Sequence, residues 1–280
     1  MLLAEDCVRV LKTSKVTRLA EGLDKTGEIS AEACKRTLDA LLSFYDKAKE
    51  FGADEVYAYA TEAMRKCKNP ELLKDAFREK TGVGIEIIDG EREAELGLEG
   101  ALKGKDGCVM DLGGASIELT VAKSGKTVYS KSLPVGIVRV KDYMNSGKGD
   151  VKDYIESVLD GFSDAPRADL YVLTGGTATH LASIDLKLPV YDPDKVNGHA
   201  FSYGRICELC ELLSTLTAEE TALLPGATRE RADTVYGGTL VLKTLFEKSK
   251  IERAVVSEDD NLDGFLRYLT EENSHNEFEN

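Results

Sequence analysis

Residues 108–122 read Cys108-Val-Met-Asp-Leu-Gly-Gly-Ala-Ser-Ile-Glu-Leu-Thr-Val-Ala122. An apolar run ends at Asp111, a short turn follows, and an alternating run resumes after Ser116. This pattern predicts two β-strands that are joined by a glycine turn. Because glycine has no Cβ, the backbone N–H groups of such a turn can converge on an anion. The alternative is a plain β-hairpin in which the glycines supply only the turn.

Two carboxylates flank this turn. Asp111 precedes it, and Glu118 lies on the strand that follows. Carboxylate oxygens are ligands that Mg²⁺ accepts, and a carboxylate can also orient a water molecule. The pattern therefore suggests a phosphate that the turn binds and that water attacks. In the alternative interpretation, Asp111 bonds to its own backbone within the turn.

Strand-like and helix-like segments alternate on both sides of this stretch. Strands are predicted at 56–59, 85–88, 108–112, 117–122, 127–133, 170–174 and 254–257, and helices at 31–51, 70–81, 92–103, 138–144, 151–162 and 262–268. The alternation indicates an α/β fold whose mixed sheets are flanked by helices. The glycine-rich, charged segment 103–107 predicts a boundary between a domain at 1–106 and a domain at 107–270. Residues 271–280 are expected to form a disordered acidic tail.

Composition narrows the class of protein. The 280 residues carry a formal net charge of −14, with 42% hydrophobic and 31% charged residues, which is typical of a soluble globular protein. The acidic balance argues against a nucleic-acid partner, since such proteins usually present a basic surface. The apolar runs are strand-sized and the first residues lack a basic leader, so we expect a cytoplasmic protein without a membrane partner. The Cys207–Cys210 pair has helical apolar spacing and is expected to be structural.

A second glycine pair follows another predicted strand. Gly175 and Gly176 come directly after the apolar run 170–174, and Thr177 is placed to begin a helix. The free N–H groups and the macrodipole at a helix N-terminus favour an anion. The other interpretation is an ordinary connection between a strand and a helix. Two turns that can bind phosphate in one domain favour the first interpretation.

Two charged residues in the first half are further candidates. Glu93 lies in an acidic cluster at the start of a predicted helix, where it could polarise a water molecule as a general base. Acidic residues in a first helical turn also simply complement the helix dipole. Arg65 could neutralise phosphate charge as a bidentate donor. Alternatively, Arg65 lies on a solvent-exposed helix face together with Lys66 and Lys68.

A later segment, residues 224–238, combines Leu-Pro-Gly with Arg229, Arg231 and a further glycine pair. Taken in order with the segments above, the chain resembles the exopolyphosphatase / guanosine-pentaphosphate phosphohydrolase (Ppx/GppA) family of the actin-like, sugar-kinase and Hsp70 ATPase superfamily. The resemblance rests on segments spread over nearly the whole chain: Arg18–Ser30, Ala-Thr-x-Ala-x-Arg at 60–65 with Asn69, Asp-Leu-Gly-Gly-Ala-Ser-x-Glu-Leu at 111–119, Gly-Gly-Thr-Ala-Thr at 175–179, Leu-Pro-Gly at 224–226 with Arg-Ala-Asp at 231–233, and Ser257–Gly264.

The resemblance implies two ribonuclease-H-like domains with the active site in the cleft between them. It implies that Glu93 activates the attacking water and that Asp111 and Glu118 hold Mg²⁺. It assigns the phosphate loop to Gly113, Gly114, Ala115 and Ser116, with Ala115 where a third glycine is usual. Together with Arg65, Gly175, Gly176 and Thr177, these residues would bind the phosphates. The implied reaction removes the terminal phosphate from inorganic polyphosphate or the 5′-phosphate from pppGpp.

The chain departs from the family pattern at its start. Family members open with a strand and a first phosphate loop of the form Asp-x-Gly-Ser/Thr-Asn-Ser, whereas residues 1–6 resemble the strand that follows that loop. A non-catalytic protein that binds polyphosphate or guanosine polyphosphates is therefore an alternative, and an ATP-dependent phosphotransferase of the same superfamily is a second one. The sequence does not choose between polyphosphate and pppGpp, and the resemblance is compatible with a homodimer.

Overall fold

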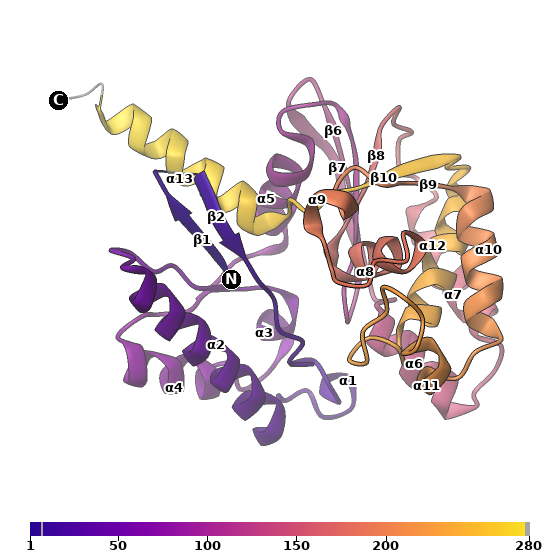
Figure 1. The fold of residues 1–280 in the computed structure, drawn as a ribbon, viewed down its shortest axis with the longest axis horizontal. Helices are drawn as coiled ribbons and strands as arrows, with labels where there is room; N and C mark the ends of the chain where they lie inside the picture. The colour runs from indigo at the N-terminus through magenta and orange to yellow at the C-terminus, as the bar shows by residue number, and fades with distance from the viewer. Residues whose placement is uncertain (7, 278–280) are drawn as a thin grey trace. The chain divides into compact units, whose positions relative to one another are not determined.

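The computed structural model describes residues 1–6 and 8–277, with the side chains of all of these except Asp24 and residues 270–277. The chain forms two compact units (Figure 1). Unit 1 comprises residues 1–93 and the chain from 265 onward, and unit 2 comprises residues 94–264. Each unit is described below by itself.

Unit 2 is built on a six-stranded mixed sheet with the strand order β7-β6-β5-β8-β10-β9. Its strands are β5 (Gly107–Leu112), β6 (Ile117–Lys123), β7 (Lys126–Leu133), β8 (Tyr171–Thr174), β9 (Ala200–Ser202) and β10 (Arg253–Val256). β5, β6 and β7 are antiparallel neighbours, whereas β5, β8 and β10 run parallel to one another. Because parallel strands end at the same edge of a sheet, the segments after β5 and β8 lie next to each other.

Helices cover both faces of this sheet. Those that follow β7 along the chain are α6 (Ile137–Ser146), α7 (Val151–Leu159), α8 (Gly175–Asp185), α9 (Pro193–Val196), α10 (Tyr203–Ser214), α11 (Ala218–Thr221) and α12 (Val235–Ser249). Met110 and Leu112 of β5 point into the large core that α6, α7, α8, α10 and α12 share. Val109, between them, packs on the other face with Leu98 and Leu102 of α5 (Gly90–Leu102). The strand alternation of 108–112 thus buries both faces of the sheet.

Unit 1 contains two small sheets and a helical layer. Its strands are β1 (Leu2–Glu5) and β2 (Val8–Lys12), which pair antiparallel, and β3 (Tyr59–Ala60) and β4 (Glu86–Ile87), which pair parallel. Its helices include α1 (Leu23–Thr26), α2 (Ala31–Phe51), α3 (Glu62–Lys66) and α4 (Glu71–Thr81). The core includes Ala33 of α2, Met64 of α3 and Phe77 of α4.

The division of the chain differs from the expected boundary at 103–107. That segment is a turn inside unit 2, where Lys103 and Gly104 both have left-handed backbone conformations. The physical reason is packing, because Leu98 and Leu102 of α5 are buried against the sheet and hold residues 94–102 in the unit that follows them.

The C-terminal segment also differs from the expectation. Helix α13 (Asn261–Glu277) begins in unit 2 and continues in unit 1, so residues 271–277 of the expected disordered tail are helical. Residues 278–280 of that tail lie outside the described residues. In the part of the chain that the structure describes, no helix is both long enough and apolar enough to cross a bilayer.

The strands predicted at 108–112, 117–122, 127–133 and 170–174 are confirmed as β5, β6, β7 and β8. The helix predicted at 31–51 is α2, with the Ser30 side chain accepting a hydrogen bond from the Ala33 N–H and Gly52 in a left-handed conformation at its end. The short strands β2 and β9 were not predicted, because three to five residues give too little periodicity to separate a strand from a loop.

Candidate functional site

The turn between β5 and β6 is held from one side by helix α6. The N–H groups of Ile137 and Val138 donate to the carbonyl oxygens of Gly113 (3.0 Å) and Gly114 (2.9 Å). Gly136 precedes them, and a Cβ there would come closer than 3.0 Å to the backbone of Gly114. The first turn of α6 therefore fixes the carbonyl side of the glycine turn.

The N–H groups of this turn are less fully hydrogen-bonded than its carbonyl groups. The N–H groups of Gly114 and Ala115 donate to no backbone carbonyl of the described residues, whereas the Gly113 N–H donates to the carbonyl of Ser116 at 3.0 Å. All of these residues except the buried Ser116 are partly exposed. Two neighbouring N–H groups are thus available to an anion or to water.

The two glycines are not required by the turn itself. Neither Gly113 nor Gly114 has a positive φ, and a Cβ at either position would meet its nearest neighbour at 3.6 Å, an ordinary contact. Residues other than glycine could therefore make the same turn. The need for a hairpin turn does not explain why both positions are glycine. The missing side chains leave the N–H groups of the turn accessible.

The second glycine turn lies beside the first. Asp111 and Thr174 are partners in the parallel β5–β8 pair, and the hydroxyl of Thr177 donates to the carbonyl oxygen of Leu112 at 3.1 Å. Gly175 has φ +83°, and a Cβ on it would overlap the Asp111 carboxylate. Glycine is therefore required at 175 on two grounds, its backbone conformation and the close approach of Asp111.

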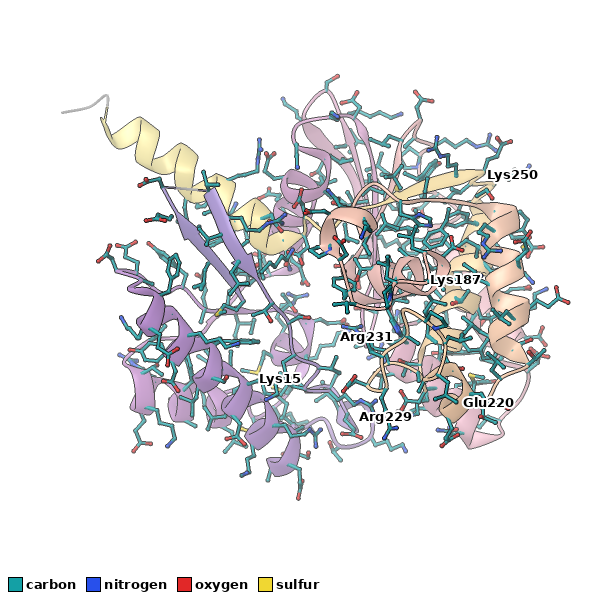
Figure 2. All side chains as sticks on the ribbon, in the orientation of Figure 1. Lys15, Lys187, Glu220, Arg229, Arg231 and Lys250 are labelled. Atoms are coloured by element: carbon teal, nitrogen blue, oxygen red, sulfur yellow. The ribbon has the colours of Figure 1, made fainter. Side chains whose placement is uncertain are left out.

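Arg231 completes this group and was not among the predicted site residues. A Cβ on Gly176 would overlap the Arg231 guanidinium, so the side chain lies directly on the first turn of α8 (Figure 2). The Arg231 side chain makes no hydrogen bond or ion pair with the residues that the structure describes, and burial lowers its pKa. The half-buried Arg231 guanidinium and the N-terminus of α8 place two positive groups at one point, which favours an anion there. The glycine at 176 is the signal in the sequence that could have indicated this contact.

His180 holds the loop that carries Arg231. The His180 ring is 4% exposed, and its Nε2 accepts a hydrogen bond of 2.9 Å from the Thr228 N–H. Gly226, at φ +85°, lets the same loop lie against the backbone of Ser183 in α8. Burial, with a smaller contribution from the charge of Arg231, lowers the pKa of His180 to about 4. The ring is therefore neutral at neutral pH and can accept the hydrogen bond from the loop.

This lowered pKa predicts a pH dependence of stability. The pKa of the histidine is near its ordinary value of 6.5 in the unfolded chain and about 4 in the folded one, so the unfolded state binds the proton first. Neutral His180 therefore makes its full contribution to the free energy of unfolding above about pH 6.5. As the pH falls toward 4, this contribution is lost, and the loss is on the order of 3 kcal/mol. His180→Gln removes the titration and keeps an acceptor. Urea unfolding at pH 7.5 and at pH 4.5 measures how much the free energy of unfolding falls between the two pH values. We expect this fall to be smaller for His180→Gln than for the original chain. An equal fall in both proteins would contradict the lowered pKa of His180.

Asp111 and Glu118 are the residues proposed to hold a metal. They are directly opposite each other in the antiparallel β5–β6 pair, so their side chains share one face of the sheet. Glu118 also accepts a hydrogen bond of 2.6 Å from Ser132. Among the described residues no group of three or more His, Cys, Asp or Glu side chains forms a metal cage. Two facing carboxylates nevertheless fit Mg²⁺, which usually binds one or two carboxylates together with waters and substrate phosphates.

In unit 1 the structure brings together Arg65 of α3 and Glu93 of α5. Arg65 Nη1 donates to Glu93 Oε2 at 2.7 Å and to the carbonyl oxygen of Ile88 at 2.8 Å. The two side chains are only 26% and 21% exposed. Arg65 is therefore not a solvated helix-face residue like its neighbours, and Glu93 is an oriented carboxylate.

Comparison with known proteins places these features in a family. The model of the family described as "Ppx/GppA phosphatase family" matches residues 5–265. The chain belongs to the Ppx/GppA phosphatase family. It is 28% identical to exopolyphosphatase 2 of Mycobacterium tuberculosis, over 93% of this chain and 89% of that protein. It is 27% identical to guanosine-5′-triphosphate,3′-diphosphate pyrophosphatase of Vibrio atlanticus, over 86% of this chain and 50% of that protein.

A longer relative and a crystal structure extend the comparison. This Ppx/GppA chain is 25% identical to the bifunctional 3-dehydroquinate synthase/phosphatase of Fusobacterium nucleatum and spans 41% of its length. The crystal structure of the Ppx/GppA family member from Aquifex aeolicus matches with a TM-score of 0.76 at 27% identity, over 95% of this chain and 90% of that one. The family and the α/β fold that the sequence predicts are thus confirmed.

The predicted site residues of this Ppx/GppA chain fall into two groups. In unit 2, the two glycine turns and Asp111 lie at adjacent strand ends, with Glu118 opposite Asp111. In unit 1, Arg65 and Glu93 form one ion pair. The structure thus brings predicted residues together within each group, and it adds the contacts of Arg231 and His180.

Proposed function

We propose that the chain is a phosphohydrolase that removes the terminal phosphate from inorganic polyphosphate. Its membership of the Ppx/GppA family supports hydrolysis of a phosphoanhydride, and its likeness to an exopolyphosphatase over 93% of its length favours polyphosphate as substrate. The observation that carries the proposal is the pair of glycine turns at the ends of β5 and β8, with the Asp111 carboxylate against Gly175.

The phosphates would be bound by unit 2. The N–H groups of Gly114 and Ala115 and the N-terminus of α8 supply hydrogen-bond donors, and Arg231 adds a cation. Because the whole chain has a net charge of −14, a polyanion must rely on such local donors. Phosphoryl transfer needs positioning and electrostatic stabilisation more than covalent chemistry, and fixed N–H groups provide both.

Glu93 is proposed to activate the attacking water. The water oxygen attacks the terminal phosphorus, its proton passes to the Glu93 carboxylate, and the bond to the bridging oxygen breaks to release phosphate and a polyphosphate shortened by one unit. The 2.7 Å contact with Arg65 orients this carboxylate. Arg65 is proposed to be shared between Glu93 and a substrate phosphate.

Asp111 and Glu118, which face each other across β5 and β6, would hold Mg²⁺. When bound, the ion would neutralise phosphate charge and template the substrate. Until it binds, two facing carboxylates repel an anionic substrate, so we expect activity to require a divalent cation.

The proposed function is tested by measuring phosphate release from polyphosphate and from pppGpp, with and without Mg²⁺. Mg²⁺-dependent release from polyphosphate supports the proposal. Release only from pppGpp would make the chain a guanosine pentaphosphate phosphatase, an activity for which the Vibrio relative is the precedent. Binding of polyphosphate without release, measured by calorimetry on the same sample, would favour the non-catalytic alternative.

The role of the β5–β6 turn gives a prediction with a matched control. Gly114→Ala adds a methyl group beside the free N–H groups, in a position with an ordinary 3.6 Å contact to Val138. We expect the KM for polyphosphate to rise by about tenfold with little change in Tm. Gly136→Ala, whose Cβ would overlap the backbone of the same turn, should instead lower Tm. An unchanged KM in Gly114→Ala would show that the turn does not bind substrate.

A further inference from the structure

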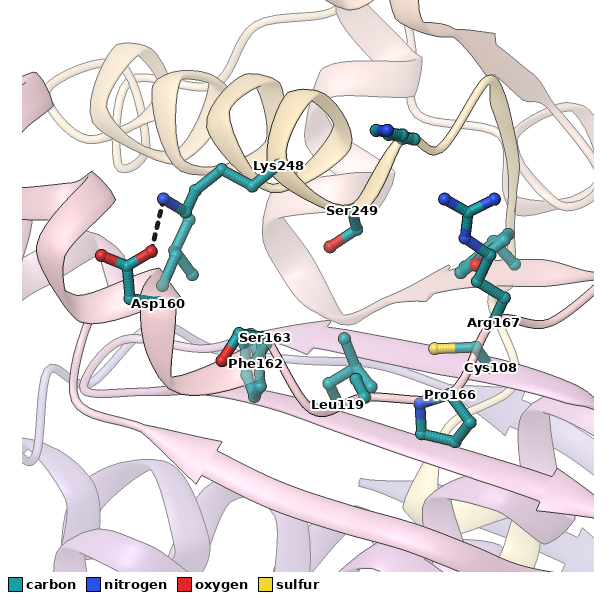
Figure 3. Close-up of a pocket in the computed structure, with 13 residues that line it drawn as sticks. Cys108, Leu119, Asp160, Phe162, Ser163, Pro166, Arg167, Lys248 and Ser249 are labelled. Atoms are coloured by element: carbon teal, nitrogen blue, oxygen red, sulfur yellow. Dashed lines mark ion pairs between the residues drawn. The ribbon is translucent and has the colours of Figure 1, made fainter.

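Unit 2 contains a cavity of about 490 Å³ that the proposed function does not use (Figure 3). We call it the basal pocket. It is lined by Cys108, Leu119, Leu159, Asp160, Phe162, Ser163, Ala165, Pro166, Arg167, Tyr171, Lys248, Ser249 and Lys250. Its size is within the range of cavities that bind small molecules.

The basal pocket lies at the opposite end of the sheet from the glycine turns. Cys108 is near the start of β5 and Tyr171 is the first residue of β8, whereas the turns follow the last residues of these strands. Cys108 and Leu112 are four positions apart along β5, which corresponds to about 13 Å. A ligand in the basal pocket would therefore not occupy the candidate phosphate site.

The charges around the basal pocket are mostly positive. Arg167, Lys248 and Lys250 line it, and Asp160 is the one carboxylate in the lining. The Asp160 carboxylate forms an ion pair with Lys248, with 2.7 Å between Oδ1 and Nζ. This pair lies on the side of the pocket away from Arg167 (Figure 3). Within the described part of the chain, Arg167 and Lys250 make no ion pair. The lining thus contains three basic residues and one acidic residue, although the chain as a whole has 50 acidic and 36 basic residues.

The floor of the basal pocket is apolar. Leu159 and Phe162 are at most 4% exposed, and Leu119 is 2% exposed. Figure 3 shows the sulfur of Cys108 directed inward above the sheet, and burial raises the pKa of this thiol to about 12. The thiol is therefore neutral at physiological pH and belongs to the apolar lining.

We propose that the basal pocket binds a small organic anion in which a phosphate or carboxylate group is attached to an apolar body. The anionic group would contact Arg167 and Lys250, and the apolar body would lie on Phe162 and Leu159. A free inorganic anion would leave the apolar floor in contact with water, and a neutral hydrophobic molecule would leave the two cations without a partner. Only a molecule with both parts satisfies the whole lining.

The test uses phenyl phosphate and benzoate as probes in calorimetric titrations of the full chain. We expect at least one of them to bind at least tenfold more tightly than both phenol and inorganic phosphate, and the tighter probe identifies the anionic group. Equal affinity for phenol would contradict the role of the cations, and equal affinity for inorganic phosphate would contradict the role of the floor. Absence of binding by both probes would overturn the proposal.

Two lysines provide a matched pair of variants that places the probe. Lys250 and Lys187 are both exposed and both have left-handed backbones, at φ +52° and +53°, so glycine fits either position without strain (Figure 2). Lys250→Gly is expected to weaken probe binding at least fivefold, and Lys187→Gly, which removes one positive charge away from the pocket, should leave it unchanged. Equal effects in the two variants would show that only net charge is sensed and would overturn the proposal.

A variant that fills the cavity tests the apolar part independently. Ser163 is an exposed lining residue, so Ser163→Phe places a ring in the basal pocket without disturbing the core. We expect loss of probe binding at an unchanged Tm and with unchanged phosphate release. Retained binding in this variant would place the probe elsewhere.

Discussion

Glu93→Gln is expected to reduce the rate of phosphate release from polyphosphate by about 10²–10⁴-fold, the usual contribution of a general base. The amide has the shape of the carboxylate and can still accept the 2.7 Å hydrogen bond from Arg65, so the geometry of the ion pair is largely kept. What is lost is the ability to take a proton from water. The measurement is kcat at saturating polyphosphate, together with Tm to show that the fold is retained.

Glu91 provides the control on the same helix. It is an exposed residue of the first turn of α5, so Glu91→Gln removes the same charge without touching the Arg65 contact. We expect its kcat to stay within about twofold of the original chain. A Glu93→Gln variant with unchanged kcat would remove Glu93 from the mechanism and leave it a structural partner of Arg65.

Gly100→Ala is expected to cause a large loss of stability. A Cβ on Gly100 would overlap the carbonyl group of Asp260, and a Cβ on Gly264 would overlap the carbonyl of Leu96, so α5 and the start of α13 cross in backbone contact. Since backbone must move to admit the methyl group, the free energy of unfolding should fall by about 3 kcal/mol or more. For a unit of this size the fall corresponds to a decrease in Tm of about 10 °C.

Gly97, one turn earlier on the same helix, is the matched control. Nothing lies within 4 Å of the position that its Cβ would occupy, and it is inside α5. Gly97→Ala should therefore stabilise the chain by about 0.5–1 kcal/mol, because alanine loses less backbone entropy than glycine in a helix. Thermal unfolding of the two variants should give shifts of opposite sign. Destabilisation by both would show that α5 tolerates no side chain at either position.

The strands of unit 2 could be predicted because their signal is local. Cys108, Met110 and Leu112 alternate with residues of the other face, and the turn after them is marked by two glycines. The strand β8 is marked in the same way by the glycines that follow it. Periodicity and turn residues are properties of a few neighbours along the chain, so they are visible without the fold.

The reason for each glycine could not be predicted from the sequence. Gly113 and Gly175 both follow buried strands, yet only Gly175 has a positive φ and only Gly175 lies against a side chain from another strand, Asp111. The glycine Gly264, in a segment that matches the family motif, is explained by helix packing. Such differences depend on contacts between residues that are far apart in sequence.

The sequence by itself determined the α/β class, the strand–turn–strand at 108–122 and the family, because these are encoded in local patterns. From the same patterns it predicted the candidate phosphate-binding and water-activating residues. The tertiary structure alone decided that residues 94–106 belong to unit 2, that Arg65 pairs with Glu93, and that Arg231 lies on the N-terminus of α8. The basal pocket is likewise formed by segments from four parts of the chain. Each of these features follows from packing between distant segments, which no local pattern of residues records.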